Sequence, residues 1–128
     1  MSDHQSNGIY ESARIAILLP CYNEGKAITH VIASFREIIP SAQIVVIDNA
    51  STDDTAEKAQ SVGATVIGES LPGKGNAVRR GFSEVEADIY VMADGDGTYD
   101  ATALPQLINK LVTDRLDMVV GTRAEKEQ

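Results

Sequence analysis

Two aspartates separated by one glycine, Asp94 and Asp96, follow an apolar run at residues 89–93. An apolar run of this length bounded by Asp and Gly is typical of a buried strand, so both acids are expected at its carboxyl end. Side chains two positions apart on an extended chain point the same way. Hard divalent cations prefer oxygen ligands, and open α/β sheets bind ligands beyond the carboxyl ends of their strands. The pair therefore predicts metal or phosphate chemistry, with an ordinary Asp-Gly turn as the alternative.

A further carboxylate, Asp48, ends the apolar run at residues 43–47. It can accept hydrogen bonds from a nucleotide base or ribose, as acids beyond strand ends do in dinucleotide-binding folds. The local alternative is that Asp48 accepts hydrogen bonds from backbone amides of its own turn. Asp53 also has two interpretations, a ligand contact or a charge that only caps and stabilises the start of a helix.

Lys74 lies just ahead of an expected helix, where an ammonium group and the free backbone amides together can bind an anion. The run from Gly68 to Lys74 nearly matches the phosphate loop of nucleotide triphosphatases. The next residue, however, is Gly75, so the hydroxyl that would ligate magnesium is missing. The alternative interpretation of Lys74 is an exposed loop lysine.

The loop after the first apolar run contains Tyr22, Asn23 and Glu24. These residues could line a base pocket, with Tyr22 supplying a stacking face, or Asn23 and Glu24 could cap the following helix. Arg123 could reach a phosphate or lie in a solvated chain end. Cys21, with no histidine placed to activate it, is interpreted as a small packing residue.

The elements that must position these residues alternate along the chain. Apolar, β-branched runs predict strands at residues 14–19, 43–47, 65–67, 89–93 and 118–120. Between them four helices are expected. The first has an apolar stripe from Ala27 to Ile39, and the second is capped by Ser51 or Thr52 with Asp53 and Asp54 in its first turn. The third covers residues 75–85, and the fourth has apolar residues at Leu104, Leu107, Ile108 and Leu111. Alternation of this kind predicts a doubly wound α/β fold with a mostly parallel sheet.

Size and composition narrow the possible classes of protein. The chain has 128 residues, 43% of them hydrophobic, and a formal net charge of −8. This size suits one domain, expected over residues 13–128 after a disordered segment at residues 1–12. The acidic balance argues against nucleic-acid binding, and no apolar stretch is long enough for a transmembrane segment. A cytoplasmic protein is the expectation.

Taken together, these residues resemble the family 2 glycosyltransferases, which use nucleotide-sugar donors and a Rossmann-like, glycosyltransferase A-type fold. The resemblance spans nearly all of residues 14–123, in the order and at the distances usual for the family. Its Gly-Lys-Gly-Asn element is most similar to the branch of dolichyl-phosphate mannose synthase and other polyprenyl-phosphate glycosyltransferases. The matching segments are residues 17–24, 46–55, 73–77 and 94–98.

The resemblance implies a role for each matching position. Asp94 and Asp96 would hold Mg²⁺ or Mn²⁺ and the donor diphosphate, with Asp96 counted as catalytic. Lys74 and Arg123 would neutralise phosphate charge. The nucleotide would be bound by Pro20, Tyr22, Glu24 and Asp48. The implied reaction is inverting transfer of a sugar to an acceptor, with a polyprenyl phosphate at the inner membrane face as one candidate.

Two departures from the family pattern bear on these roles. Thr98 stands where the mannose synthase branch often has a glutamine metal ligand. The sheet is expected to stop after its fifth strand, whereas family members continue for roughly another hundred residues. Because a sheet without its later strands exposes an edge, a homo-oligomer is a further expectation.

Two other functions remain open at this stage. The strand followed by Asp-Gly-Asp-Gly-Thr is also similar to the first motif of haloacid-dehalogenase-type phosphatases, in which Asp94 would be the nucleophile and Asp96 the general acid. The second alternative is a non-catalytic module that binds a nucleotide sugar. Donor binding without transfer or hydrolysis would distinguish this module from an enzyme.

Overall fold

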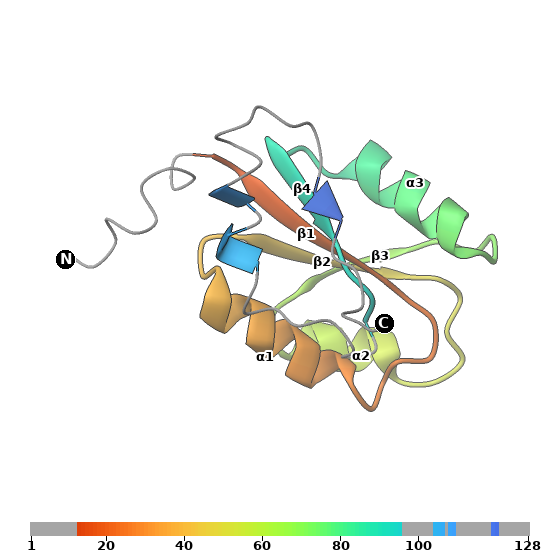
Figure 1. Cartoon of the computed structure of the whole chain (residues 1–128). Coiled ribbons are helices and arrows are strands. Elements are labelled where there is room, and N and C mark those ends of the chain that lie inside the picture. Colours follow the sequence, from red (N-terminus) through yellow and green to blue (C-terminus); the bar gives the residue numbers. More distant parts are fainter. Residues whose placement is uncertain (1–12, 96–103, 107, 110–118, 121–128) are drawn as a thin grey trace, which may run out of the picture.

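Five parallel strands form the centre of the protein, in the order β3-β2-β1-β4-β5 (Figure 1). The structure, a computed structural model, describes residues 13–95, 104–106, 108–109 and 119–120. The elements are β1 (Ile15–Cys21), α1 (Ile28–Ile38), β2 (Gln43–Asp48), α2 (Thr55–Ser61), β3 (Thr65–Gly68), α3 (Lys74–Glu84), β4 (Ile89–Met92) and β5 (Val119–Val120). The predicted doubly wound, parallel α/β fold is confirmed.

Helices cover both faces of the sheet, with α1 and α2 on one side and α3 on the other (Figure 1). Alternate residues of the strands supply the two cores, because successive side chains on a strand point to opposite faces. Ile17 and Leu19 of β1 pack with Ile32 of α1, whereas Ala16 and Leu18 belong to the core beneath α3. Burial on both faces explains why the strands are almost entirely apolar.

Helix α3 lies close to the sheet at Gly81. A Cβ atom at this position would lie 3.1 Å from methyl groups of both Ile47 and Leu18. The missing side chain lets the helix backbone approach β1 and β2, and this approach fixes where the first residue of α3, Lys74, meets the sheet edge.

The predicted strand positions are confirmed, and most helix predictions hold. Residues 104–106 and 108–109 are helical, with Leu104 and Ile108 buried in the α1 core; Leu107 and Leu111 lie outside the described side chains. The predicted cap of the second helix is wrong. Its N-cap is Asp54, and its first acidic residue is Glu57, because Ser51, Thr52 and Asp53 instead bond across to the preceding loop.

No helix in the described ranges combines the length and apolar character that a bilayer crossing would require. The segment at residues 1–12, predicted to be disordered, lies outside the described residues.

Candidate functional site

The site lies where the direction of strand winding reverses. From β1 the chain moves outward to β2 and β3, and then returns to add β4 and β5 on the other side of β1. β1 and β4 are thus neighbours whose following connections diverge, which leaves a crevice at their carboxyl ends. Leu18 of β1 pairs with Met92 of β4, and Ala93 N donates to Leu18 O at 3.2 Å. The residues after these partners therefore face each other across the crevice.

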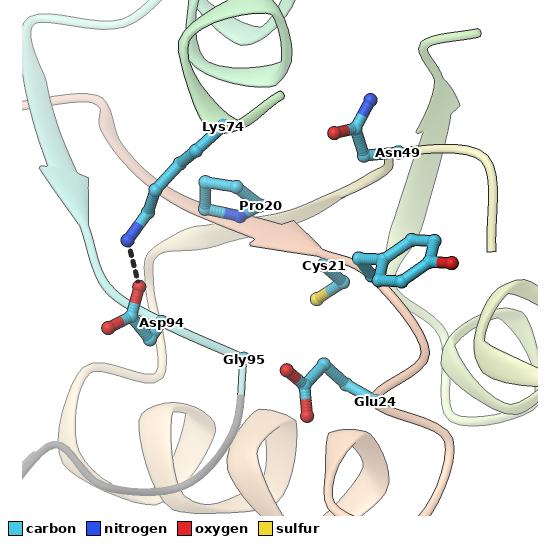
Figure 2. Close-up of a pocket in the computed structure, with 8 residues that line it drawn as sticks. Pro20, Cys21, Glu24, Asn49, Lys74, Asp94 and Gly95 are labelled. Atoms are coloured by element: carbon cyan, nitrogen blue, oxygen red, sulfur yellow. Dashed lines mark hydrogen bonds and ion pairs between the residues drawn. The ribbon is translucent and has the colours of Figure 1, made fainter. Parts of the chain in front are cut away.

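A pocket of about 240 Å³ occupies this crevice (Figure 2). It is lined by residues from the ends of β1 and β2, from the start of α3 and from the segment after β4: Pro20, Cys21, Tyr22, Glu24, Asn49, Lys74, Asp94 and Gly95. A second hollow of about 460 Å³ shares Tyr22, Asn49 and Lys74 with it and adds Ala50, Pro72 and Gly73. The two hollows adjoin, and Lys74 belongs to both.

An ion pair crosses the pocket. The Lys74 ammonium group donates a hydrogen bond to Asp94 Oδ1 (Figure 2). The Lys74 side chain is 64% exposed and the Asp94 side chain 22% exposed, so the pair lies at the pocket mouth and is open to solvent on the lysine side. This arrangement places one cation and one carboxylate within reach of the same ligand.

The floor of the pocket depends on a close approach between Gly95 and Cys21. A Cβ atom on Gly95 would lie 2.4 Å from Cys21 Sγ. Cys21 is buried, and its thiol donates to Leu19 O at 3.3 Å. The interpretation of Cys21 as a packing residue is therefore confirmed, and its sulfur additionally determines that residue 95 has no side chain.

The loops after β1 and β2 are bonded to each other. Asn23 Oδ1 accepts from Thr52 N at 2.8 Å, and Asn23 N donates to Ser51 Oγ at 2.9 Å. Gly25 N donates to Asp53 Oδ2 at 3.0 Å. At the start of α1, the Glu24 carbonyl accepts from Ala27 N at 3.0 Å and from Ile28 N at 2.9 Å. The alternative in which the Asn23 side chain caps α1 is wrong, since Ala27 is the N-cap and Asn23 Oδ1 is bonded to the next loop. These contacts instead hold the Tyr22 loop in place.

Asp53 is a structural link between the loops. Besides Gly25 N, it accepts hydrogen bonds from the Thr55 hydroxyl and from Thr55 N, the latter at 3.0 Å. The hydrogen bond from the Thr55 hydroxyl is the main cause that lowers the pKa of the Asp53 carboxyl below its ordinary value, with the backbone amides adding to it. Asp53 therefore does more than charge the start of a helix.

Asp48 accepts a hydrogen bond within its own turn, which is the local alternative considered from the sequence. Its Oδ1 accepts from Ser51 N at 3.3 Å, in the turn that follows β2. It is half-buried and does not line the two hollows described above. A contact between Asp48 and a nucleotide stays a prediction.

The neighbouring residue, Asn49, was not singled out from the sequence. Its carboxamide makes three hydrogen bonds to the loop between β3 and α3, and it is 6% exposed. The signal that could have found it is a polar residue directly after a buried strand, in a loop where side-chain amides commonly bond to backbone.

Of the predicted site residues, the structure brings Pro20, Tyr22, Glu24, Lys74 and Asp94 to one pocket. Asp96 and Arg123 lie outside the described residues, so the predicted pairing of Asp94 with Asp96 stays a prediction. The roles of all these residues in binding are likewise predictions.

The residues present fit a divalent cation in part. Asp94 and Glu24 offer the hard oxygen donors that Mg²⁺ and Mn²⁺ prefer. Within the described ranges, no three His, Cys, Asp or Glu side chains are grouped closely enough to hold a metal ion. A complete site would thus need further oxygen ligands, from Asp96 or from the ligand itself.

Comparison with known proteins identifies the family. The model described as "Glycosyl transferase family 2" matches residues 16–128. Protein RfbJ of Shigella flexneri is 57% identical over 117 residues, which cover 91% of this chain and 91% of that protein. A dolichyl-phosphate hexose transferase of Haloferax volcanii is 34% identical over 112 residues, covering 88% of this chain and 49% of that protein. These matches favour the glycosyltransferase resemblance over the phosphatase alternative.

Solved structures agree with this match. Glucosyl-3-phosphoglycerate synthase of Mycobacterium tuberculosis, crystallised with Mn²⁺ and UDP-glucose, superposes with a TM-score of 0.74 at 28% sequence identity. The superposition covers 88% of this chain and 44% of that one. The chain thus spans less than half of this solved relative, although it spans most of RfbJ.

Proposed function

Because this chain belongs to glycosyl transferase family 2, we propose that its pocket binds the diphosphate of a nucleotide-sugar donor together with a divalent cation. The observation that carries the proposal is the meeting of Lys74 and Asp94 at the winding reversal between β1 and β4. A diphosphate needs positive charge, which Lys74 supplies directly. Asp94 would supply a cation ligand, as expected from the Mn²⁺ in the crystals of the M. tuberculosis relative.

The adjoining hollows suggest how the donor would lie. The hollow between Tyr22 and Pro72 would receive the nucleoside, because the Tyr22 ring is 59% exposed and offers a flat face. The diphosphate would lie beside Lys74, at the boundary of the two hollows. Asn76 N and Ala77 N donate to Gly73 O at 3.1 and 3.2 Å, so the amides at the start of α3 that an anion placed there would meet are those of Lys74 and Gly75.

The proposed reaction transfers the sugar with inversion. An acceptor oxygen attacks the anomeric carbon, the bond from that carbon to the diphosphate oxygen breaks, and the electron pair leaves with the nucleoside diphosphate. A bound divalent cation supplies stabilisation of the negative charge on the leaving group. Lys74 contributes to the same stabilisation from the protein. Asp96, named from the sequence as a metal ligand and catalytic residue, and Arg123 belong to this proposal as predictions.

We further infer a polyprenyl phosphate as the acceptor class. The support is the dolichyl-phosphate hexose transferase among the relatives, and the similar Gly-Lys-Gly-Asn element at residues 73–76. A phosphate acceptor is already ionised at neutral pH, so that attack on the sugar requires little help from a protein base. Self-association through an uncovered edge of the sheet is a separate proposal, which light scattering at high concentration would test.

A thermal-shift panel tests donor binding. UDP, GDP and dTDP are added with and without Mn²⁺, and the proposal expects one of them to raise the melting temperature in a concentration-dependent and Mn²⁺-dependent way. Incubation with the matching nucleotide sugar and a short polyprenyl phosphate then separates the functions. Product formation supports the enzyme, whereas binding with neither transfer nor donor hydrolysis supports a non-catalytic module. The absence of any Mn²⁺-dependent binding by a folded sample contradicts both.

A further inference from the structure

Asn49 connects the end of β2 to the loop that carries Lys74. Its Nδ2 donates to Glu69 O at 3.0 Å and to Leu71 O at 2.8 Å. Its Oδ1 accepts from Gly73 N at 3.0 Å. One side chain therefore bonds three backbone groups of the five-residue loop between β3 and α3.

The bonding capacity of Asn49 restricts what else it can do. A carboxamide has two N–H donors and one oxygen with two lone pairs. Both donors are directed to loop carbonyls, so only one acceptor lone pair is left for a ligand. Asn49 N in turn donates to Cys21 O at 2.8 Å, which fixes the residue to the end of β1 as well. Asn49 lines both hollows, but all its side-chain bonding capacity except this one lone pair is used by the protein.

The loop ends where the proposed diphosphate site begins. Gly73, the last residue held by Asn49, has φ of 117°, a conformation that residues with a side chain rarely adopt, and it is the N-cap of α3. Lys74 follows directly and reaches Asp94. Any shift of Gly73 would therefore move the Lys74 backbone and the first amides of the helix.

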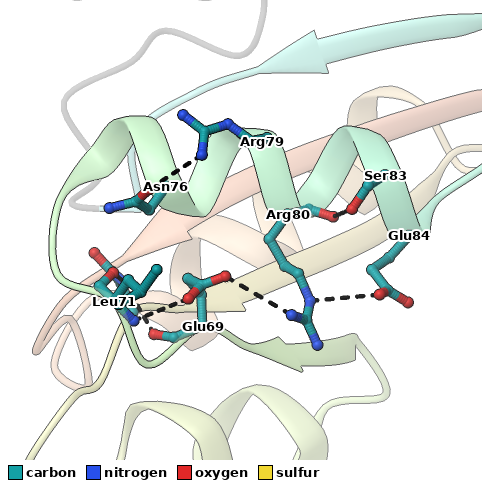
Figure 3. Close-up of polar contacts among 8 residues, drawn as sticks. Glu69, Leu71, Asn76, Arg79, Arg80, Ser83 and Glu84 are labelled. Atoms are coloured by element: carbon teal, nitrogen blue, oxygen red, sulfur yellow. Dashed lines mark hydrogen bonds and ion pairs between the residues drawn. The ribbon is translucent and has the colours of Figure 1, made fainter.

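Other contacts of the loop are weaker. Arg80 of α3 reaches Glu69 Oε1 at 3.8 Å and Glu84 Oε2 at 3.5 Å (Figure 3). The Arg80 and Glu84 side chains are 43% and 49% exposed, whereas the Glu69 side chain is 12% exposed. Glu69 Oε2 accepts from Leu71 N at 2.8 Å, within the loop itself. Ion pairs at these distances with an exposed arginine contribute little to stability, whereas hydrogen bonds of a buried amide are costly to lose. Asn49 is thus the main side-chain link between the loop and the sheet among the described residues.

We propose that Asn49 is a positioning residue, which holds the β3–α3 loop so that Lys74 and the first turn of α3 meet the diphosphate of the donor. The inference rests on the proposed function for the identity of the ligand. This role differs from a direct contact between Asn49 and the nucleoside. Because Asn49 acts through the loop, its loss should affect the binding of ligands that carry the diphosphate and not of those that lack it.

Hydrogen–deuterium exchange tests the positioning step without any ligand. Asn49→Ala should speed exchange in residues 69–76 by at least about tenfold, as loss of buried hydrogen bonds predicts, while the matched control Arg80→Gln leaves these rates near wild type. If the alanine variant does not fold, Asn49→Asp replaces it. This variant keeps the size of the side chain and the acceptor for Gly73 N but loses both donors, so exchange in residues 69–76 should again be faster than in wild type. Unchanged exchange in the Asn49 variant that folds overturns the inference.

Calorimetry with UDP and with uridine, both in the presence of Mn²⁺, tests the consequence for binding. Asn49→Ala should lower the affinity for UDP by about tenfold and leave the affinity for uridine unchanged. The double variant with Lys74→Ala should lose less affinity for UDP than the product of the two single losses, because part of the effect of Asn49 acts through Lys74. Equal losses for UDP and uridine, or losses that multiply, overturn positioning through Lys74. If wild-type protein binds no nucleotide, the proposed function fails, and the exchange experiment still decides whether Asn49 holds the loop.

Discussion

Lys74 and Asp94 form an ion pair across the crevice between α3 and the end of β4, so the proposed cation ligand is already neutralised by a protein cation. A divalent ion that binds Asp94 must compete with the Lys74 ammonium group. A donor diphosphate relieves this competition, because its oxygens give Lys74 another partner. The pair therefore couples the binding of cation and donor.

Lys74→Gln should raise the affinity for Mn²⁺ alone by about two- to fivefold, the range expected from removing an exposed ion pair worth ~0.5–1 kcal/mol. The same change should lower the affinity for UDP in the presence of Mn²⁺, since a cationic partner of the phosphates is lost. Calorimetric titrations of both ligands measure the two effects. Lys58→Gln is the matched control, because Lys58 pairs with Asp54 at 3.5 Å and is not among the residues that line the two hollows. Weaker binding of Mn²⁺ alone by the Lys74 variant would contradict the competition.

The contact between Gly25 and the next loop should not tolerate a methyl group. A Cβ atom at Gly25 would lie 2.3 Å from Asp54 Oδ1 and 2.9 Å from Asp53 Oδ2. Gly25→Ala should therefore lower the free energy of unfolding by about 1–3 kcal/mol, as overpacking does. Gly75→Ala is the control, since nothing lies within 4 Å of a Cβ there, and alanine in a helix is neutral or stabilising. Denaturant unfolding compares the two variants; equal stability would show that the loops separate without cost.

Because Gly95 lies close to Cys21, a substitution at Cys21 should recover part of the stability lost by a substitution at Gly95. Gly95→Ala places a methyl group against the Cys21 sulfur and should destabilise the protein by about 1–3 kcal/mol. Adding Cys21→Ala removes the sulfur and should recover part of that loss. Chemical denaturation of the single and double variants measures this coupling. Strictly additive effects would mean that the two residues do not contact each other.

Asp53 predicts a specific dependence of stability on pH. Hydrogen bonds, first of all that from the Thr55 hydroxyl, lower the pKa of Asp53 in the folded protein. The folded state thus favours the ionised carboxylate, and its contribution to stability is complete above the unfolded pKa of about 3.9. It is lost as the pH falls from there through the lower folded pKa. Asp53→Asn should flatten this part of the acid-unfolding curve, and an unchanged slope between wild type and variant would contradict the assignment.

Strands and their order along the chain were predictable, because buried parallel strands are continuous apolar runs. The order of the strands across the sheet and the pairing of Lys74 with Asp94 were not predictable, since both depend on which strands become neighbours. The error at the second helix has a physical cause as well. Ser51 and Thr52 are good capping residues, but Asn23 from the preceding loop competes for their polar groups.

The most direct test is a titration of UDP, with GDP and dTDP in parallel, into wild-type protein and Asp94→Asn in the presence and absence of Mn²⁺. The proposal predicts that at least one nucleotide binds wild-type protein more tightly with Mn²⁺, and that Asp94→Asn, with an unchanged melting temperature, loses this enhancement. An enhancement of equal size in the variant would contradict a role for Asp94 in holding the cation and donor.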